Sequence, residues 1–156
     1  MLHAAAVARN GRAMIFSGPS GSGKTTLARL AESQDLLSDE SVAVQRDQQN
    51  GAGYEVYATP FYGELSEIAE RPRAPLEEIF LIGPPETRPK QPFRISPVPP
   101  GQAMAELLAQ TFLRTLTQPL LLKTLPLLED LVRSVRIRRL QFTPSPELWS
   151  FIDDQS

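Results

Sequence analysis

The chain has 156 residues, 22% of them charged, with a formal net charge of -2 and a sequence pI near 5.5. This length suits one domain over residues 1–156, and the charge balance gives no electrostatic footprint for nucleic acid. The lack of cysteine excludes disulfides and thiolate chemistry, and no apolar stretch is long enough to span a bilayer. Because little chain precedes the first motif, we expect no signal peptide and a cytoplasmic protein with no membrane partner.

The first elements expected are two strands, over 2–7 and 13–17, joined by a turn at Asn10–Gly11. Asn-Gly between two short apolar runs is a strong signal for a β-hairpin. A helix of two to three turns should follow Lys24, because apolar residues recur there at helical spacing. Two further strands, "SVAVQR" and "YEVYATP", flank the turn "DQQNGAG" and should pair antiparallel.

The second half of the chain should begin with a buried strand over 76–83, followed by a proline-rich, irregular excursion over 84–100. A helix is expected over 101–116, and a second over about 119–134, which Pro126 should kink or split. A strand and a short helix then close the chain. Because strands follow the first helix without a crossover, we expect a mixed, largely antiparallel sheet with flanking helices rather than a parallel sheet.

The motif "GPSGSGKT", from Gly18 to Thr25, fits the phosphate-binding pattern G-x-x-x-x-G-K-[ST]. Its glycines permit positive φ and leave backbone N–H groups open to phosphate oxygens, and with the following helix they form an anion nest. Lys24 should neutralise the β- and γ-phosphates, and the Thr25 hydroxyl should ligate Mg²⁺. The predicted cofactors are ATP and Mg²⁺. The predicted nucleotide-binding residues are Gly18, Pro19, Ser20, Gly21, Ser22, Gly23, Lys24, Thr25 and Thr26.

Two adjacent acids, Asp39 and Glu40, follow the predicted helix in "LLSDES". Beside a nucleotide, one could hold the metal while the other accepts a proton from an attacking hydroxyl. A pair of solvated loop acids is an equally weighted alternative. His3 is the only histidine, and a lone histidine on a short strand is more often packed or surface-exposed than catalytic.

For other residues the sequence gives weaker evidence of a role in the site. Tyr62 and Gly63 follow a strand, where they could border a substrate cleft or anchor a turn. Basic residues around the proline-rich excursion could form a flap over a triphosphate or stay solvated. They are Arg71, Arg73, Arg88, Lys90 and Arg94. The last basic group is expected on an exposed strand face, and it comprises Arg136, Arg138 and Arg139.

The segments "LHAAAV", "AMIFSGPSGSGKTTLA" and "LLSDES" resemble the C-terminal kinase domain of HPr kinase/phosphorylase, particularly the small, stand-alone members of that superfamily. This superfamily also includes the P-loop carboxykinases for phosphoenolpyruvate (PEP). The resemblance implies a PEP carboxykinase-like, HPr kinase C-terminal-like P-loop fold. It also implies that Asp39 is the base, that Lys24 holds the phosphates, and that His3 orients the acid pair. The metal would lie at Thr25, Glu40 and Asp39, with Glu40 standing where the family usually has aspartate.

The motif and the resemblance together predict an HPr serine kinase-like, ATP-dependent kinase. It would transfer the γ-phosphoryl of Mg-ATP to a hydroxyl of a protein, peptide or small-molecule acceptor. Two alternatives stay open. One is a non-catalytic nucleotide-binding switch or assembly partner, and the other is a small-molecule kinase or carboxykinase-like enzyme. Because the HPr kinases are hexamers, the resemblance leaves room for a homo-oligomer.

Overall fold

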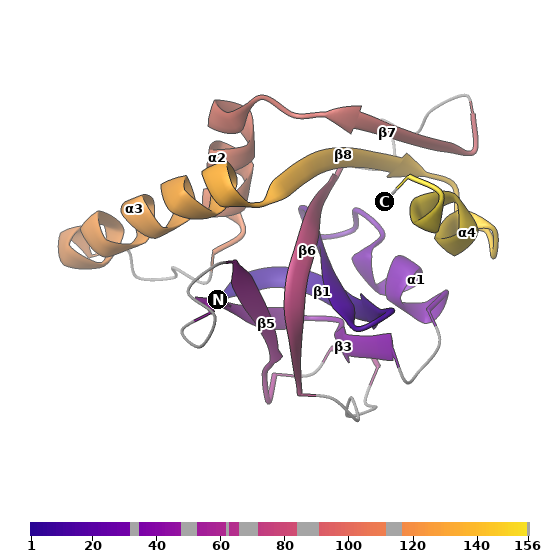
Figure 1. The fold of residues 1–156 in the computed structure, drawn as a ribbon, viewed down its shortest axis with the longest axis horizontal. Helices are drawn as coiled ribbons and strands as arrows, with labels where there is room; N and C mark the ends of the chain where they lie inside the picture. Colours follow the sequence, from indigo (N-terminus) through magenta and orange to yellow (C-terminus); the bar gives the residue numbers. More distant parts are fainter. Residues whose placement is uncertain are drawn as a thin grey trace.

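The structure is a computed structural model that describes residues 1–31, 35–47, 53–61, 63–65, 72–83, 91–111 and 117–155. The described part contains eight strands and four helices (Figure 1). In chain order these are β1 (Leu2–Arg9), β2 (Arg12–Ser17), α1 (Lys24–Arg29), β3 (Leu36–Ser38), β4 (Ser41–Arg46), β5 (Tyr54–Ala58), β6 (Arg73–Ile82), β7 (Phe93–Pro97), α2 (Pro100–Ala109), α3 (Gln118–Ser134), β8 (Arg136–Phe142) and α4 (Leu148–Asp153).

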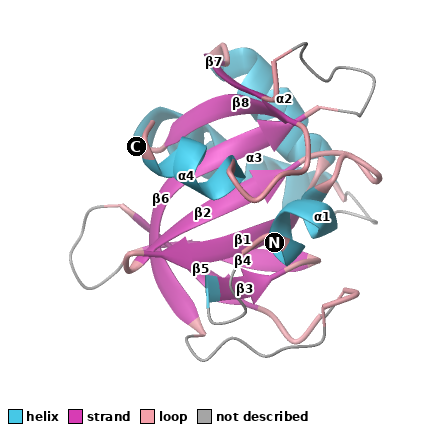
Figure 2. Ribbon diagram, turned by 90° about the vertical axis from the view of Figure 1, so that its right-hand side faces the viewer, coloured by secondary structure: helices cyan, strands magenta, loops and turns pink. Residues whose placement is uncertain are grey.

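Five of the strands close on themselves into a barrel (Figure 2). Going around it, β2 pairs with β1, β1 with β4, β4 with β5 and β5 with β6, all antiparallel. The ring closes where β6 runs parallel to β2. β6 can serve both neighbours because its start, from Arg73 to Pro75, pairs with β5, while the stretch from Leu76 to Leu81 pairs with β2.

The fold class expected from the sequence, a PEP carboxykinase-like P-loop sheet, is therefore wrong. The protein is a mixed α/β structure dominated by the closed five-stranded barrel. The expected strand over 76–83 omitted Arg73, Ala74 and Pro75, and these residues make the pairing with β5 that closes the ring. A strand that began at Leu76 would reach only its parallel neighbours β2 and β8, which would leave the sheet open.

Small side chains contribute to the barrel interior, as suits a ring of only five strands, because barrel diameter grows with strand number. Four alanines belong to the interior cluster together with Ile15 and Leu81, and they are Ala4, Ala6, Ala13 and Ala74. α2 and α3 pack into this same cluster, through residues that include Leu107 and Leu131. These two helices therefore cover one part of the barrel, and they lie on the opposite side of the molecule from α4 (Figure 1).

A second cluster lies on the outer face of β2, β6 and β8, beneath α1 and α4. At its centre the rings of Phe16 and Phe80 stack with centroids 5.4 Å apart, and Trp149 meets Phe16 edge-on at 5.6 Å. Aromatic pairs in these geometries add to the free energy gained by burying their area. The cluster holds α1 against the barrel through Leu27, and so fixes where the glycine-rich loop ends.

The predicted first hairpin is confirmed, whereas the predictions for the two long helices hold only in part. The β1–β2 hairpin turns at Asn10 and Gly11, whose φ values of 52° and 78° are both positive, as a two-residue hairpin loop needs. α3 continues through Pro126 as one helix, so of the two predicted effects, a kink or a split, the split does not occur. α2 ends at Ala109, and residues 112–116 of the helix expected there lie outside the described residues. None of the described helices is both long enough and apolar enough to cross a membrane.

Candidate functional site

The glycine-rich loop leaves β2 at Ser17 and enters α1 at Lys24. Gly18 must lack a side chain, because an added Cβ would lie 2.4 Å from the carbonyl oxygen of Ile82. Gly23 adopts a φ of 103°, which disfavours any other residue. The Ser22 N–H donates to the carbonyl of Pro19 at 3.2 Å, which closes a turn within the loop. Sequence and packing therefore fix this loop as a tight backbone ring.

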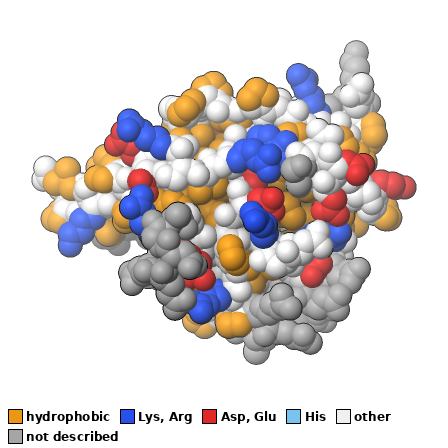
Figure 3. Space-filling model, viewed as in Figure 1, with side chains coloured by type: hydrophobic (Ala, Val, Ile, Leu, Met, Phe, Trp, Pro, Cys, Tyr) orange, Lys and Arg blue, Asp and Glu red, His pale blue; other side chains and the backbone are white. Residues whose placement is uncertain are grey.

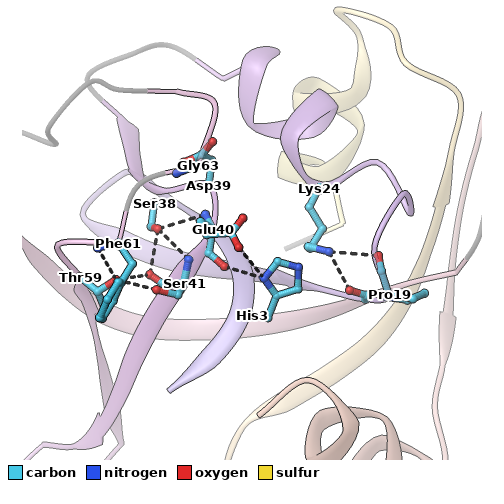
Figure 4. Close-up of polar contacts among 11 residues, drawn as sticks. His3, Pro19, Lys24, Ser38, Asp39, Glu40, Ser41, Thr59, Phe61 and Gly63 are labelled. Atoms are coloured by element: carbon cyan, nitrogen blue, oxygen red, sulfur yellow. Dashed lines mark hydrogen bonds and ion pairs between the residues drawn. The ribbon is translucent and has the colours of Figure 1, made fainter. Parts of the chain in front are cut away.

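Lys24 reaches back across that ring. Its Nζ donates hydrogen bonds to the carbonyl oxygens of Gly18 at 2.8 Å and Pro19 at 3.0 Å (Figure 4). Burial lowers the pKa of the Lys24 ammonium, and the nearby negative charge of Glu40 opposes this shift. Within the described part of the chain, the buried Ser22 hydroxyl has no hydrogen-bond partner. A buried cation that donates to two backbone carbonyls at the cavity can exchange them for phosphate oxygens, to which it bonds more strongly.

A serine turn between β3 and β4 positions the two acids. The Ser38 hydroxyl donates to the carbonyl of Ser41 at 2.8 Å and accepts the Ser41 N–H at 3.2 Å. The Ser41 hydroxyl in turn contacts Thr59 Oγ1 on the segment after β5 at 2.7 Å. These buried bonds hold Asp39 and Glu40 at the edge of the barrel (Figure 4). The sequence "SDES" thus makes a defined corner, because the Ser38 hydroxyl bonds to backbone groups within the turn and the Ser41 hydroxyl ties the turn to Thr59.

The Asp39 side chain is buried, with 3% of the residue exposed. Its Oδ1 accepts the Gly63 N–H at 3.0 Å, and its Oδ2 accepts the Leu65 N–H at 2.9 Å. Gly63 packs so closely that an added Cβ would lie 2.5 Å from Oδ2. Asp39 therefore anchors the segment 63–65 against the β3–β4 corner.

Glu40 has a different environment, with 42% of its side chain exposed. Its backbone carbonyl lies 2.9 Å from His3 Nδ1, and its carboxylate oxygen Oε1 lies 3.4 Å from the same atom. Because a carbonyl only accepts, Nδ1 must carry the proton, and in the neutral ring Nε2 is then the acceptor nitrogen. His3 lies between Glu40 and the contact of Lys24 with Pro19 (Figure 4). The histidine and the glutamate thus meet at the side of the glycine-rich loop.

These groups line one cavity of about 380 Å³, here called the acidic cavity. Arg29 and Glu64 form an ion pair at its rim. The structure brings together most of the residues predicted from the sequence, namely His3, Ser20, Gly21, Gly23, Lys24, Thr25, Thr26, Asp39 and Glu40. In the described residues no cluster of three or more His, Asp or Glu side chains is placed to hold a metal ion alone.

A second cavity of about 630 Å³, the arginine cavity, adjoins the start of the same loop. Gly18 and Pro19 line it, together with the ends of β2 and β6 and side chains of α2, β7 and β8. Arg139 donates two hydrogen bonds to Glu106, at 2.8 and 2.5 Å. The remaining polar side chains that line it include Arg94, Ser96, Gln102 and Gln141. Of its lining residues, sequence reasoning had proposed only Gly18, Pro19 and Arg94 for a site.

The prediction that the β8 arginines decorate an exposed face is wrong for Arg138 and Arg139, whose side chains are 17% and 18% exposed. Adjacent strand residues point to opposite faces. Arg138 therefore meets the buried Glu78, while Arg139 meets Glu106. In the space-filling view, basic side chains gather over β8 with acidic side chains beside them (Figure 3). The doublet of arginines within a strand was the signal that one of them must face inward.

The structure describes only some of the turn and basic residues that the sequence offered as further candidates for the site. Arg73 pairs with Glu55 across the barrel strands, with 3.5 Å between Nη1 and Oε2, and lies away from the loop. Gly63 lines the acidic cavity. Tyr62, Arg71, Arg88 and Lys90 lie outside the described residues.

Fold and site together define a closed mixed barrel with a glycine-rich loop between two cavities. Comparisons of the chain with models of protein families, with curated proteins and with solved structures find no match.

Proposed function

We propose that the protein binds a nucleoside triphosphate with Mg²⁺ at the Gly18–Thr25 loop and transfers its terminal phosphoryl group to a hydroxyl. We propose ATP as the phosphoryl donor and the cytoplasm as the compartment in which the protein acts. The observation that carries the proposal is the shared cavity. Part of the loop, its buried Lys24, and the acids Asp39 and Glu40 line the same 380 Å³ space. The proposal rests on these residues and not on the fold class, which the sequence mispredicted.

The donor's phosphates suit the loop because its backbone is folded tightly and its cation is preformed. Phosphate oxygens would replace the carbonyls of Gly18 and Pro19 as acceptors for Lys24 Nζ. Hydrogen bonds between a cation and phosphate oxygens are about twice as strong as neutral ones. Binding of the phosphates would thus be driven mainly by charge at the loop.

Glu40, oriented by His3, is the carboxylate that we assign to the transfer step. The acceptor oxygen forms a bond to the terminal phosphorus, and the bond from that phosphorus to the bridging oxygen breaks. The electron pair leaves with the nucleoside diphosphate, while the hydroxyl proton passes to Glu40. Asp39 is less available for this role, because both of its oxygens already accept backbone N–H groups.

Mg²⁺ would be held by Thr25, by the phosphates, by a remaining lone pair of the ionised Asp39 and by the Glu40 oxygen that does not take the proton, and it would neutralise charge on the transferred group. Mg²⁺ usually takes only one or two protein carboxylates beside phosphates and water. Two acids and one hydroxyl at the acidic cavity therefore match its usual protein donors.

A nucleotide-binding switch is the second candidate function, and the environment of Asp39 favours it. Asp39 tethers the segment 63–65, and Glu64 of that segment pairs with Arg29 on the helix that follows the loop. A ligand that drew either Asp39 or Arg29 away would release contacts of this segment. Such a switch would bind Mg-ATP without transferring phosphate.

Binding and turnover of Mg-ATP test the two functions. We expect calorimetric binding that weakens roughly 10- to 100-fold in Lys24→Ala, because hydrogen bonds to a charged group are lost. Lys123→Ala, which removes an exposed lysine from α3, is the matched control and should bind as the wild type does. Full nucleotide affinity in Lys24→Ala would rule out the loop as the phosphate site. Tight binding without release of labelled phosphate would favour the switch.

A further inference from the structure

The arginine cavity adjoins the loop at the end where the terminal phosphate would lie. Lys24 Nζ contacts the carbonyls of Gly18 and Pro19, and a lysine in this motif reaches the β- and γ-phosphates. Gly18 and Pro19 both line the arginine cavity. The transferred group would therefore sit at the border between the two cavities, with Glu40 on one side and the arginine cavity on the other.

A backbone hydrogen bond joins the walls of the two cavities. The His3 N–H donates to the carbonyl of Gln110 at 2.8 Å. His3 lines the acidic cavity, whereas Gln110, at the end of α2, lines the arginine cavity. The two cavities are therefore neighbours across a single strand-to-helix contact, which places a molecule in the arginine cavity close to His3.

The arginine cavity carries one net positive charge, from two arginines and one glutamate among its lining residues. Arg139 is neutralised by two hydrogen bonds to Glu106, which also accepts from Gln102 at 2.9 Å. Arg94 is exposed on β7, and within the described chain it makes no ion pair. A guanidinium without an acid partner, beside amide groups, suits a carboxylate, which it can bind through two parallel hydrogen bonds.

We propose that the arginine cavity holds the phosphoryl acceptor, and that this acceptor carries a carboxylate that pairs with Arg94. This inference rests on the proposed phosphoryl transfer. The acceptor's hydroxyl oxygen gains the phosphoryl group, its proton passes to Glu40, and the nucleoside diphosphate leaves with the electron pair of the broken bond. A free hydroxy acid and a peptide with an acidic residue beside serine offer the same chemistry to Arg94.

Two pairs of probes differ only in the acid. Glycerate is compared with glycerol, and the capped peptide Asp-Ser-Gly with capped Asn-Ser-Gly, each titrated calorimetrically with Mg²⁺ and a non-hydrolysable ATP analogue present. In at least one pair, we expect the acidic probe to bind at least about tenfold more tightly than the neutral probe. The neutral probe cannot form the ion-paired hydrogen bond with Arg94. The pair that responds identifies a metabolite or a peptide as the source.

Arg94→Gln should abolish the preference for the acid and leave the affinity for the nucleotide analogue unchanged. Arg133→Gln, at an exposed α3 arginine, is the matched control and should retain the preference. Equal binding of acid and neutral probes by the wild type would overturn the inference while nucleotide binding stands. Weaker nucleotide binding in Arg94→Gln would assign the cavity to the nucleoside and would also overturn it. Failure of the analogue to bind anywhere would instead refute the proposed function.

Discussion

Two carboxylates in this protein, one in the interior and one at the acidic cavity, differ in what surrounds them. Glu78, on β6, is 2% exposed in its side chain, and Arg138 closes over it with two hydrogen bonds, one of 2.6 Å. Glu40, at the β3–β4 corner, is 42% exposed and faces a histidine at 3.4 Å. A buried acid whose oxygens are held by a fixed cation serves stability, because neither oxygen is open to a ligand. An acid that stays partly hydrated beside a titratable ring can exchange partners.

The largest effect is expected from breaking the buried pair. Arg138→Ala leaves Glu78 buried with only Arg136 nearby, at 3.4 Å. We expect the free energy of unfolding in urea to fall by about 3 kcal/mol, since the buried carboxylate loses both hydrogen bonds from Arg138 and keeps only the longer ion pair with Arg136. Nucleotide affinity should not change, because Arg138 lines neither cavity beside the loop.

Two variants sharpen this prediction. Arg133→Ala removes an exposed arginine that pairs with Glu129 within α3, and we expect a loss of no more than about 0.5 kcal/mol. The double variant Glu78→Met/Arg138→Met should recover most of the stability, because it removes both charges together. A loss below about 1 kcal/mol in Arg138→Ala would contradict the assignment of Glu78 to stability.

The exposed acid should behave in the opposite way. Glu40→Gln is expected to lower the rate of phosphoryl transfer, or of ATP hydrolysis, by roughly 100-fold or more, as loss of a general base does. The unfolding free energy should change by only about 0.5 kcal/mol, as at other surface positions. Glu64→Gln is the matched control in the same cavity, and its rate should stay within severalfold of the wild type. An unchanged rate in Glu40→Gln would remove this residue from the transfer step.

Asp39 lies between these two extremes, because it is buried but its partners are backbone N–H groups. In Asp39→Asn an amide NH₂ replaces one oxygen and meets a donor, so we expect a loss of about 1–3 kcal/mol in unfolding free energy. Amide hydrogen exchange at Gly63 and Leu65 should accelerate. Asp154→Asn, an exposed position after α4, should change neither quantity.

A second outcome would move Asp39 into the chemistry. If Asp39→Asn slows phosphoryl transfer about 100-fold while exchange at Gly63 and Leu65 stays as in the wild type, Asp39 is the base, as the family resemblance implied. Gly63→Ala offers an independent check on the anchor. Its Cβ would lie 2.5 Å from Asp39 Oδ2, so the segment must shift and exchange should accelerate there too.

Local signals in the sequence predicted the parts of the site better than the fold. The Asn10–Gly11 turn and the glycine-rich loop depend on short-range backbone chemistry, so their positions could be predicted. The closure of the barrel depends on Arg73–Pro75, where a strand begins with a charge and a proline and so shows no apolar pattern. Nothing local distinguishes that start from the end of a loop. Long-range pairing with β5 decides it.

The same dependence on long-range pairing explains why the arginine cavity was not predicted from the sequence. Glu106 and Arg139 are 33 residues apart, and each belongs to a segment whose pattern is fully explained by its own helix or strand. Their pairing appears only once α2 lies beside β8. Burial of Glu78 is similarly invisible, because a glutamate within an apolar strand resembles an ordinary solvent-facing position until β8 brings Arg138 against it.

The smallest expected effect concerns Glu106, which is the acid of the arginine cavity. Hydrogen bonds from Arg139 hold the pKa of Glu106 below the ordinary 4.5, against the opposing effect of partial burial. A carboxyl with a lower pKa in the folded state stabilises the protein above the unfolded value and loses this contribution as pH falls through the folded pKa. We therefore expect the wild type to lose stability relative to Glu106→Gln as the pH falls below about 4.5. The difference should stay under about 1 kcal/mol, because the Glu106 side chain is 36% exposed and solvent screens its pairing with Arg139.

Urea unfolding of both proteins between neutral and acidic pH measures this difference, and Glu147→Gln, at an exposed glutamate, should follow the wild-type curve. Parallel curves for wild type and Glu106→Gln would show that the Arg139 pair adds nothing to folding.

The variant Glu106→Gln also tests the charge of the arginine cavity. Removing the carboxylate leaves Arg139 without its acid, so two positive charges face the space near the loop. Glycerate should then bind several-fold more tightly at neutral pH, whereas a cavity built for a neutral group would show no gain.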